Sequence, residues 1–195
     1  MKTKNKVTSI KFNNISFKIS SLDCTKEEND ILLTWINPDF KTGPEYSYDI
    51  MLAIGQANRF QVYILKEHLH SSDSFIINPG QIPTEAIIFS VLPIDNKSLF
   101  NESFFKIKES LNKYKEEFNC RYLGMWFPST DYNLYIDNLF NYILMVDSLK
   151  EITIYCEEKE KGKIYSLLEK EVFKRRTKTF KDKIYYFFNK LFQTR

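Results

Sequence analysis

The chain has 195 residues, which suits one domain, or one domain with an appendage. It has neither a run of 18 apolar residues nor the apolar core of a signal peptide, so we expect a cytoplasmic protein without a membrane span. Residues 172–195 hold eight Lys/Arg and one Asp, a net charge of +7, whereas residues 1–171 hold 20 Lys/Arg and 24 Asp/Glu, a net charge of −4. Because the basic charge is confined to the tail, nucleic acid is not expected as a ligand of the body.

Three segments near the N-terminus predict strands. Residues 7–12 and 15–20 indicate two short strands or one bulged hairpin. Residues 31–36 are an almost continuous apolar run that Pro38 ends, which is typical of a strand buried on both faces of a mostly parallel sheet.

Helices are predicted on both sides of that strand. Residues 25–30 indicate a polar helical turn, with Thr25 as its N-cap and Glu28 at capping-box spacing. Residues 47–69 predict a helix that breaks near Gly55.

The middle of the chain adds two strands and the clearest helix. Residues 74–80 predict a short strand closed by a Pro-Gly turn, and residues 85–93 a central strand. Residues 98–119 predict a helix, because apolar side chains recur in steps of four and three at Phe100, Phe104, Ile107, Leu111, Tyr114 and Phe118.

The last elements repeat the alternation. Residues 121–128 and 151–157 predict strands, residues 134–148 predict a helix, and a further helix follows around residues 164–172. Alternating strands and helices predict a three-layer α/β/α sandwich with a mixed, mostly parallel sheet of about six strands. Cys24, Cys120 and Cys156 lack zinc spacing and indicate reduced thiols, of which the last two are best explained as core packing.

Element order and several local matches over roughly residues 7–170 resemble a macro domain, the fold that binds ADP-ribose. Leu22-Asp23-Cys24-Thr25 is similar to the family's Gly-Asp-Ile-Thr motif, and residues 29–37 are similar to the strand that ends in Asn. The resemblance implies that Asp23 accepts from the adenine amino group, that Cys24 supplies a backbone N–H, and that Asn37 faces the distal ribose.

Two loops resemble the phosphate loops of the family but contain little glycine. Residues 41–50 keep only Gly43, and Ser47 stands where the family has its loop Asp. Residues 124–135 match the second loop at Ser129 and Thr130, while Asp131 replaces a glycine and would repel a diphosphate unless it points outward. The resemblance implies that Ser129, Thr130 and Asp131 belong to the ligand site.

Aromatic side chains enter both loops. Tyr46 and Tyr48 lie in the first, and Tyr132 and Tyr135 in the second. They can stack on a base or on an extra ring of a ligand and give selectivity, or they can simply fill loops of a tyrosine-rich chain.

The leading hypothesis is a non-catalytic sensor of ADP-ribose or of an NAD-derived conjugate, without a further cofactor; by resemblance it belongs in bacterial antiphage signalling. A ligand-free protein-interaction or immunity module is one alternative. An ADP-ribosylhydrolase that uses a displaced Asp49 is the other. His68 and His70 lack a third ligand with suitable spacing, so no metal site is predicted.

The tail is treated as a separate segment, with a domain at residues 1–171 and a basic amphipathic helix at 172–195. Its apolar side chains fall on one helical face at Phe180, Ile184, Phe187, Phe188 and Leu191. Such a helix docks on an acidic protein partner, lies on an anionic membrane surface, or covers apolar surface of its own domain.

Overall fold

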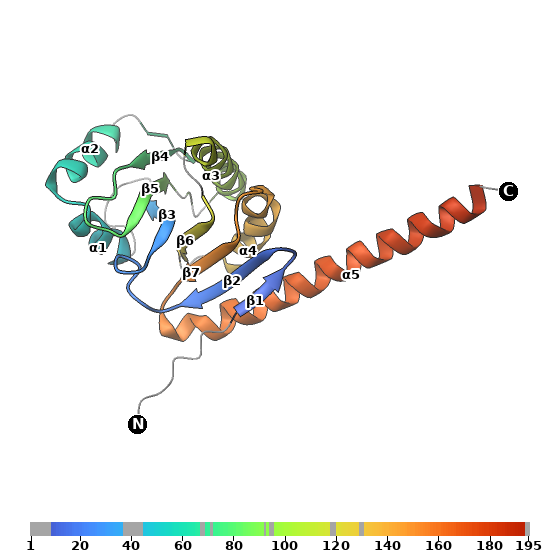
Figure 1. The fold of residues 1–195 in the computed structure, drawn as a ribbon. Coiled ribbons are helices and arrows are strands. Elements are labelled where there is room, and N and C mark those ends of the chain that lie inside the picture. Colours follow the sequence, from blue (N-terminus) through green and yellow to red (C-terminus); the bar gives the residue numbers. More distant parts are fainter. Residues whose placement is uncertain are drawn as a thin grey trace, which may run out of the picture.

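The computed structural model describes residues 9–36, 45–66, 69–70, 72–91, 93, 96–117, 120–128 and 131–193. Within these ranges seven strands form one sheet in the order β1-β2-β7-β6-β3-β5-β4 (Figure 1). The strands are β1 (Ser9–Phe12), β2 (Ile15–Ser20), β3 (Asn29–Ile36), β4 (Ser74–Ile77), β5 (Thr84–Val91), β6 (Tyr122–Trp126) and β7 (Glu151–Tyr155). The sheet therefore has one strand more than the predicted six, because both arms of the N-terminal hairpin pair.

The five inner strands are parallel, and the two edge strands are antiparallel to their neighbours. This confirms the predicted mixed, mostly parallel sheet. The central strand β3 is buried from Ile31 to Ile36, as its continuous apolar sequence requires when helices cover both faces.

Helices lie on both faces of the sheet (Figure 1). They are α1 (Glu45–Ala53), α2 (Gln56–Lys66), α3 (Lys97–Glu117), α4 (Tyr132–Asn141) and α5 (Lys161–Gln193), with 3-10 turns at Ile143–Met145 and Glu158–Glu160. One face packs on α3 and α4, where Trp35 contacts Phe104 and Tyr135. The fold is thus the predicted α/β sandwich.

The connection from β2 to β3 corrects one prediction. Thr25 does not cap a helical turn through residue 30. Instead, Asp23 accepts hydrogen bonds from the Thr25 N–H (3.0 Å) and from the Thr25 hydroxyl (2.6 Å), and the strand already begins at Asn29. A carboxylate two residues before Thr25 competes successfully for its N–H group and forms a local turn.

Two helices also differ from the sequence expectation. The predicted helix over residues 134–148 begins earlier, at Tyr132, and leaves α-helical geometry at Tyr142 before the 3-10 turn. The helix after β7 is continuous for 33 residues, so the predicted boundary at 171/172 falls inside it. Beyond that boundary Arg175 still donates to Asn141, and Arg176 donates to the Lys11 carbonyl, so α5 stays in contact with the body of the domain past residue 172.

The core is apolar and contains the three cysteines. Cys24, Cys120 and Cys156 are all buried and unpaired, which confirms that the last two pack in the core. Burial raises the pKa of each of the three thiols to about 12, so they stay protonated at neutral pH. No helix of the described residues is long and apolar enough to cross a membrane.

Candidate functional site

The carboxyl ends of the parallel strands β2, β3, β6 and β7 meet at one edge of the sheet. The segments that leave this edge contain the residues that the sequence singles out. In α/β sheets this edge is the usual place for a ligand, because strand ends and helix N-termini converge there.

Asp23 lies in the turn after β2 with its carboxylate 44% exposed. One oxygen accepts from Thr25, and the other pairs with the Lys26 ammonium at 2.8 Å. Lys26, and then Thr25, hold the pKa of Asp23 below its usual 3.8. The carboxylate is therefore ionised and accessible. Oδ1 already accepts two hydrogen bonds from Thr25, whereas Oδ2 retains a lone pair for the amine of a base.

Cys24 differs from its neighbour because its side chain is 3% exposed and belongs to the core. After burial, the negative charges of Asp23 and Asp49 contribute to the raised pKa of this thiol. Asp49 also helps to raise the pKa of Lys26, after the larger effect of Asp23. Helix α1 thus brings the exposed Asp49 within electrostatic range of the Asp23 turn.

Seven of the residues expected in the site are described only in part or not at all. Tyr46, Ser47 and Tyr48 occupy the first turn of α1, and their side chains lie outside the description. Asn37, Gly43, Ser129 and Thr130 lie outside the described residues.

Asp131 uses its carboxylate to cap α4. Its Oδ1 accepts from the backbone N–H groups of Asn133 (2.9 Å) and Leu134 (3.1 Å). These are the donors that a helix N-terminus offers to an anion such as a phosphate. In this chain a carboxylate of the protein already occupies that anion position.

Tyr132 is held by three contacts within the protein. Its ring lies 4.7 Å from the Phe127 ring, and the Lys163 ammonium sits 3.6 Å from its centroid on a cation–π contact. Its hydroxyl donates to Glu160 Oε1 at 3.1 Å. Burial, and then the hydrogen bond to Glu160, raise the pKa of Tyr132. The ring is therefore a structural link between α4 and the turn after β7.

Tyr135 corrects the expectation that it contacts a ligand. Its side chain is 0% exposed and packs against the rings of Trp35, Phe104 and Phe127. The reason is helical periodicity, because Tyr135 shares the sheet-facing stripe of α4 with Ile136, Leu139 and Phe140. Its hydroxyl has no hydrogen-bond partner among the described residues.

Sequence reasoning missed the polar contacts that join the turns after β2 and β7. Ser21 Oγ donates to Glu158 Oε2, which also pairs with Lys161 at 3.2 Å. Glu160, which is 5% exposed, accepts from the Glu157 N–H at 3.1 Å in a capping box. The Glu157-x-x-Glu160 spacing was a usable signal for this turn, but Ser21 carried none.

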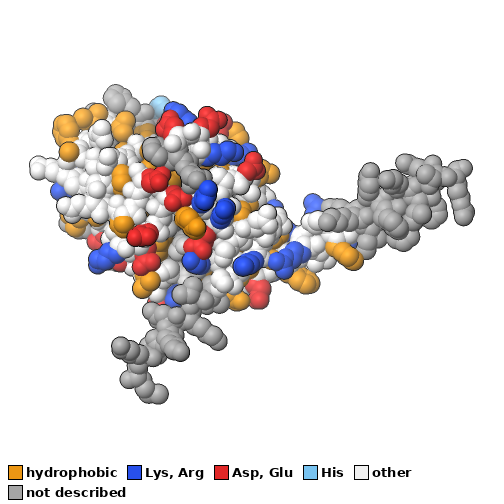
Figure 2. All heavy atoms as spheres, in the orientation of Figure 1, with side chains coloured by type: hydrophobic (Ala, Val, Ile, Leu, Met, Phe, Trp, Pro, Cys, Tyr) orange, Lys and Arg blue, Asp and Glu red, His pale blue; other side chains and the backbone are white. Residues whose placement is uncertain are grey.

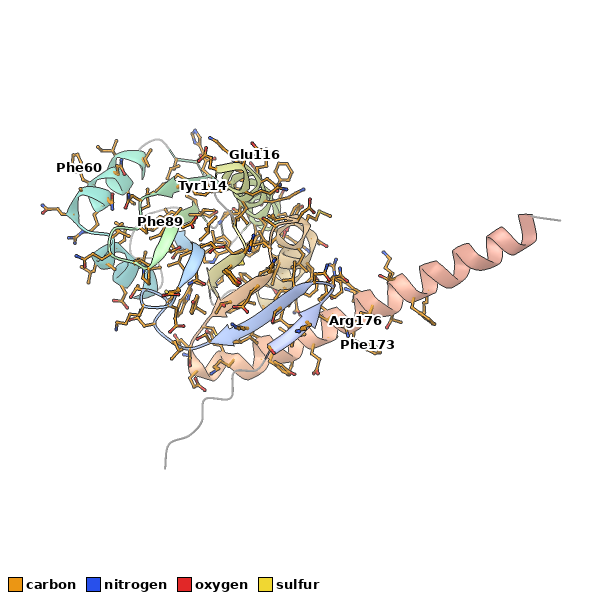
Figure 3. All side chains as sticks on the ribbon, in the orientation of Figure 1. Phe60, Phe89, Tyr114, Glu116, Phe173 and Arg176 are labelled. Carbon is orange, nitrogen blue, oxygen red and sulfur yellow. The ribbon has the colours of Figure 1, made fainter. Side chains whose placement is uncertain are left out.

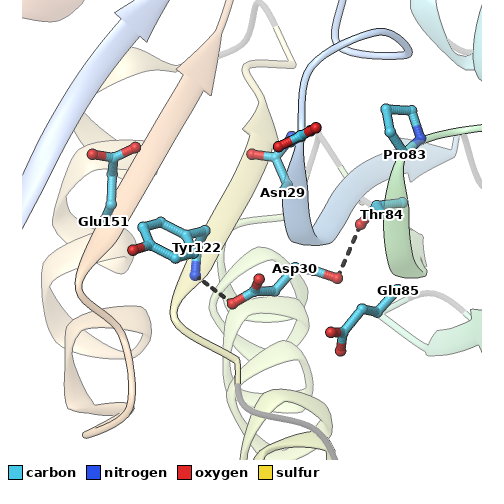
Figure 4. A pocket seen from close by; sticks show the side chains of 8 residues that line it. Asn29, Asp30, Pro83, Thr84, Glu85, Tyr122 and Glu151 are labelled. Atoms are coloured by element: carbon cyan, nitrogen blue, oxygen red, sulfur yellow. Dashed lines mark hydrogen bonds between the residues drawn. The ribbon is translucent and has the colours of Figure 1, made fainter.

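A hollow of about 600 Å³ lies at the opposite edge of the sheet, where the strands begin (Figure 4). Asp30, at its centre, accepts from the N–H groups of Arg121 (2.5 Å) and Tyr122 (2.9 Å). The Thr84 hydroxyl donates to the Asp30 carbonyl at 3.0 Å. These groups tie the strand starts together, and we assign them a structural role.

Clusters of metal-ligating side chains are absent from the described residues. The described residues contain no group of three or more His, Cys, Asp or Glu that could hold a metal ion. His70 is described and exposed, whereas His68 is outside the description.

Comparison with known proteins gives a consistent structural result. No protein-family model matches the chain, and no curated protein matches it. An Oceanobacillus iheyensis macrodomain structure with ADP superimposes with a TM-score of 0.67 at 16% identity, over 86% of this chain and 97% of the other.

Two other macrodomains are also similar in structure to this chain. The macro domain of ganglioside induced differentiation associated protein 2 gives a TM-score of 0.64 at 11% identity, over 78% of this chain and 82% of that one. A Trypanosoma brucei macrodomain in complex with ADP-ribose gives a TM-score of 0.60 at 13% identity, over 80% of this chain and 68% of that one. Together with the sheet order and the helices on both faces, these matches identify the chain as having the macro-domain fold.

Proposed function

We propose that this protein is a macro-like module that binds ADP-ribose, or an NAD-derived conjugate of it, as a sensor. The observation that carries the proposal is the ionised, accessible carboxylate of Asp23 at the carboxyl edge of the sheet. A carboxylate there is an acceptor for the exocyclic amine of adenine. The similar structures with ADP and with ADP-ribose support this class of ligand.

The surroundings of Asp23 define the rest of the proposed ligand site. The Asp23 turn adjoins α1, whose Asp49 acts electrostatically on Lys26 and Cys24. The first turn of α1 carries Tyr46, Ser47 and Tyr48, which we propose to contact the ligand together with Asn37 and Gly43 of the preceding segment. We also propose that Ser129 and Thr130 contribute polar groups from the second loop.

A sensor is favoured over an enzyme because the described groups near α4 serve the fold. Asp131 caps the helix, and Tyr132 is held by Phe127, Lys163 and Glu160. We propose that the phosphates of the ligand are therefore held mainly on the α1 side of the site. A role in bacterial antiphage signalling, in which a nucleotide switches an effector, is part of this proposal.

Calorimetry on the whole chain tests the proposal with adenosine, AMP, ADP and ADP-ribose. We expect measurable binding of ADP-ribose, and Asp23→Ala should weaken it about tenfold or more, because a hydrogen bond to a charged acceptor is lost. Asp147→Ala is the matched control, because Asp147 is 91% exposed and lies in the turn before β7. Absence of heat with all four ligands at millimolar concentration would refute the proposal.

A ligand-free interaction module is the second candidate, and the capped N-terminus of α4 favours it. In that case the domain holds its macro-like shape without a nucleotide and acts through a partner. It predicts no thermal shift with any adenine nucleotide. It also predicts that removing residues 174–195 abolishes co-purification of the partner, while Asp23→Ala has no effect.

A further inference from the structure

Helix α5 leaves the body of the domain and continues as a single projecting helix (Figure 1). It still contacts the body at Arg176, but its faces differ in exposure: Val172 is 5% exposed and the next residue, Phe173, is 71% exposed. Phe180 is 65% exposed. Phenylalanine rings with this much exposure on a projecting helix form an apolar surface that the described part of the chain does not cover.

The two exposed rings lie on one side of α5. They are seven residues apart, which is about two turns or ~10 Å along the axis. Figure 3 labels Phe173 close to Arg176 on α5. The sequence continues the same steps of four and three along the helix with Ile184, Phe187 and Leu191.

Cations border this apolar stripe on both sides. Lys174 and Lys181 each follow one of the two phenylalanines by one residue, about 100° around the helix. Arg176 precedes Phe180 by four residues and lies on the other margin. Figure 2 shows basic and apolar side chains side by side on the described part of α5.

The stripe continues onto the N-terminal hairpin. A hollow of about 290 Å³ lies between α5 and the end of β1, lined by Phe12, Asn13, Arg176, Thr179 and Phe180. Arg176 donates to the Lys11 carbonyl at 2.7 Å, which fixes the helix against the hairpin at this point. The apolar surface is therefore anchored to the folded body.

We propose that this face of α5 docks on an anionic lipid surface. Helices that lie in a membrane interface have this arrangement, with phenylalanines on one side and lysines and arginines at both margins. The rings enter the acyl boundary while the long cationic side chains reach the headgroups. Residues 1–171 have a net charge of −4 and are not attracted to such a surface, so the tail, with a net charge of +7, sets the orientation of the protein on the membrane.

Charge weighs against one of the two other occupants, and the width of the apolar stripe weighs against the other. A second copy would place Lys174, Arg176 and Lys181 against the same cations of its partner, which destabilises helix pairing. An acidic protein helix satisfies the charges, but a pairing seam needs only a narrow apolar stripe. Phe188 and Tyr185 widen the apolar sequence pattern beyond such a seam.

Vesicle co-sedimentation of the full chain tests the proposal. We expect binding to phosphatidylcholine vesicles that contain phosphatidylserine, little binding to phosphatidylcholine alone, and weaker binding as salt rises. Lys178 is exposed one turn before Lys181 on the same side of α5, and the double change Lys178→Glu with Lys181→Glu should weaken binding about tenfold or more. Phe180→Ser should also weaken it, because the ring no longer enters the interface.

Matched controls separate this surface from general charge and hydrophobicity. Lys97→Glu with Lys113→Glu changes the net charge equally, from two exposed positions of α3. Phe60→Ser removes a ring that is 67% exposed on α2. Both controls should bind vesicles like the unchanged protein, and the melting temperature of each variant checks folding.

Four results would overturn the proposal. The first is an absence of phosphatidylserine-dependent binding at low salt, and the second is an equal loss in the control variants. The third is binding to soluble polyglutamate as tight as to vesicles and insensitive to Phe180→Ser, which would indicate an acidic protein partner. The fourth is a dimer in light scattering that Phe180→Ser dissociates, which would indicate self-association.

Discussion

The Asp131 carboxylate accepts a hydrogen bond from the Asn133 N–H at 2.9 Å, and so closes the N-terminus of α4. The same atom also accepts from Leu134. These two helix donors are thus satisfied within the chain. Both the stability of α4 and the ligand preference of the site follow from this contact.

Asp131→Ala should destabilise the protein. Loss of an N-cap oxygen leaves two helix N–H groups without a partner, which costs about 1 kcal/mol in free energy of unfolding. Asp131→Asn retains an acceptor oxygen and should change the unfolding free energy by less than about 0.5 kcal/mol. Urea denaturation of the two variants measures both values. Equal destabilisation would show that the charge, and not the hydrogen bonds, is what stabilises the helix.

Asp131→Asn should also raise the affinity for ADP-ribose about fivefold. The amide keeps the cap but removes a negative charge from the α4 side of the site, which repels a diphosphate, and one close charge pair in water is worth about 1 kcal/mol. Calorimetry with adenosine provides the control, because adenosine has no phosphate and should bind both proteins alike. A similar gain for adenosine would contradict this explanation.

Tyr135→Phe should leave the fold intact and raise its stability. The Tyr135 hydroxyl is buried without a partner among the described residues, and such a group costs about 1–3 kcal/mol. Removing it should raise the melting temperature, while ADP-ribose affinity stays unchanged because the ring is not exposed. A stability loss would reveal a hydrogen bond to this hydroxyl, and an affinity loss would place it in the site.

The Asp73–Lys106 pair should make stability fall in acid. Burial alone would raise the pKa of Asp73, but hydrogen bonds from Lys106 (2.7 Å) and from the His70 N–H (2.7 Å) hold that pKa below 3.8. The folded state therefore binds its proton less readily than the unfolded state. The contribution is complete above the unfolded pKa of 3.8 and is lost as pH falls through the lower folded pKa.

Asp73→Asn tests this linkage. The difference in unfolding free energy between the unchanged protein and the variant should be largest at pH 5–6, about two units above the unfolded pKa. It should shrink as pH falls below 3.8. Denaturation at a series of pH values measures it, and a difference that does not depend on pH would contradict the assignment.

Gly80 and Gly55 should respond differently to alanine. Both have positive φ, at +64° and +84° respectively. A Cβ at Gly80 would lie 2.3 Å from the Ile54 carbonyl oxygen, whereas Gly55 has open space around it. Gly55→Ala should cost only the backbone strain of about 1 kcal/mol, and Gly80→Ala should cost about 2 kcal/mol more. Thermal denaturation compares the two, and equal losses would show that the loop at Gly80 relaxes.

The sequence predicted the elements with strong periodicity. The apolar run 31–36 and the stripe from Phe100 to Leu111 became a buried strand and a buried helix face. These patterns depend only on neighbours along the chain and on burial, which a single sequence records directly. The break at Gly55 is also predictable from a local property, because glycine permits the positive φ found there.

The candidate site was harder to predict because its contacts join distant parts of the chain. The partner of Tyr132 is Glu160, 28 residues away, and the partner of Ser21 is Glu158, 137 residues away. Likeness to a loop motif placed Tyr135 beside a ligand, but the helical stripe of α4 takes it into the core. A motif match gives a residue's position in the chain, whereas the packing of the helix decides which way its side chain faces.

The position of β7 has a consequence for how the chain is made. This strand separates β2 from β6 and is the last strand to be synthesised. The N-terminal hairpin therefore cannot join the parallel sheet until Tyr155 has left the ribosome. Because pairing across so many residues is slow and leaves strand edges open meanwhile, we expect the domain to fold after synthesis of α5 has begun, with the nascent hairpin in need of protection.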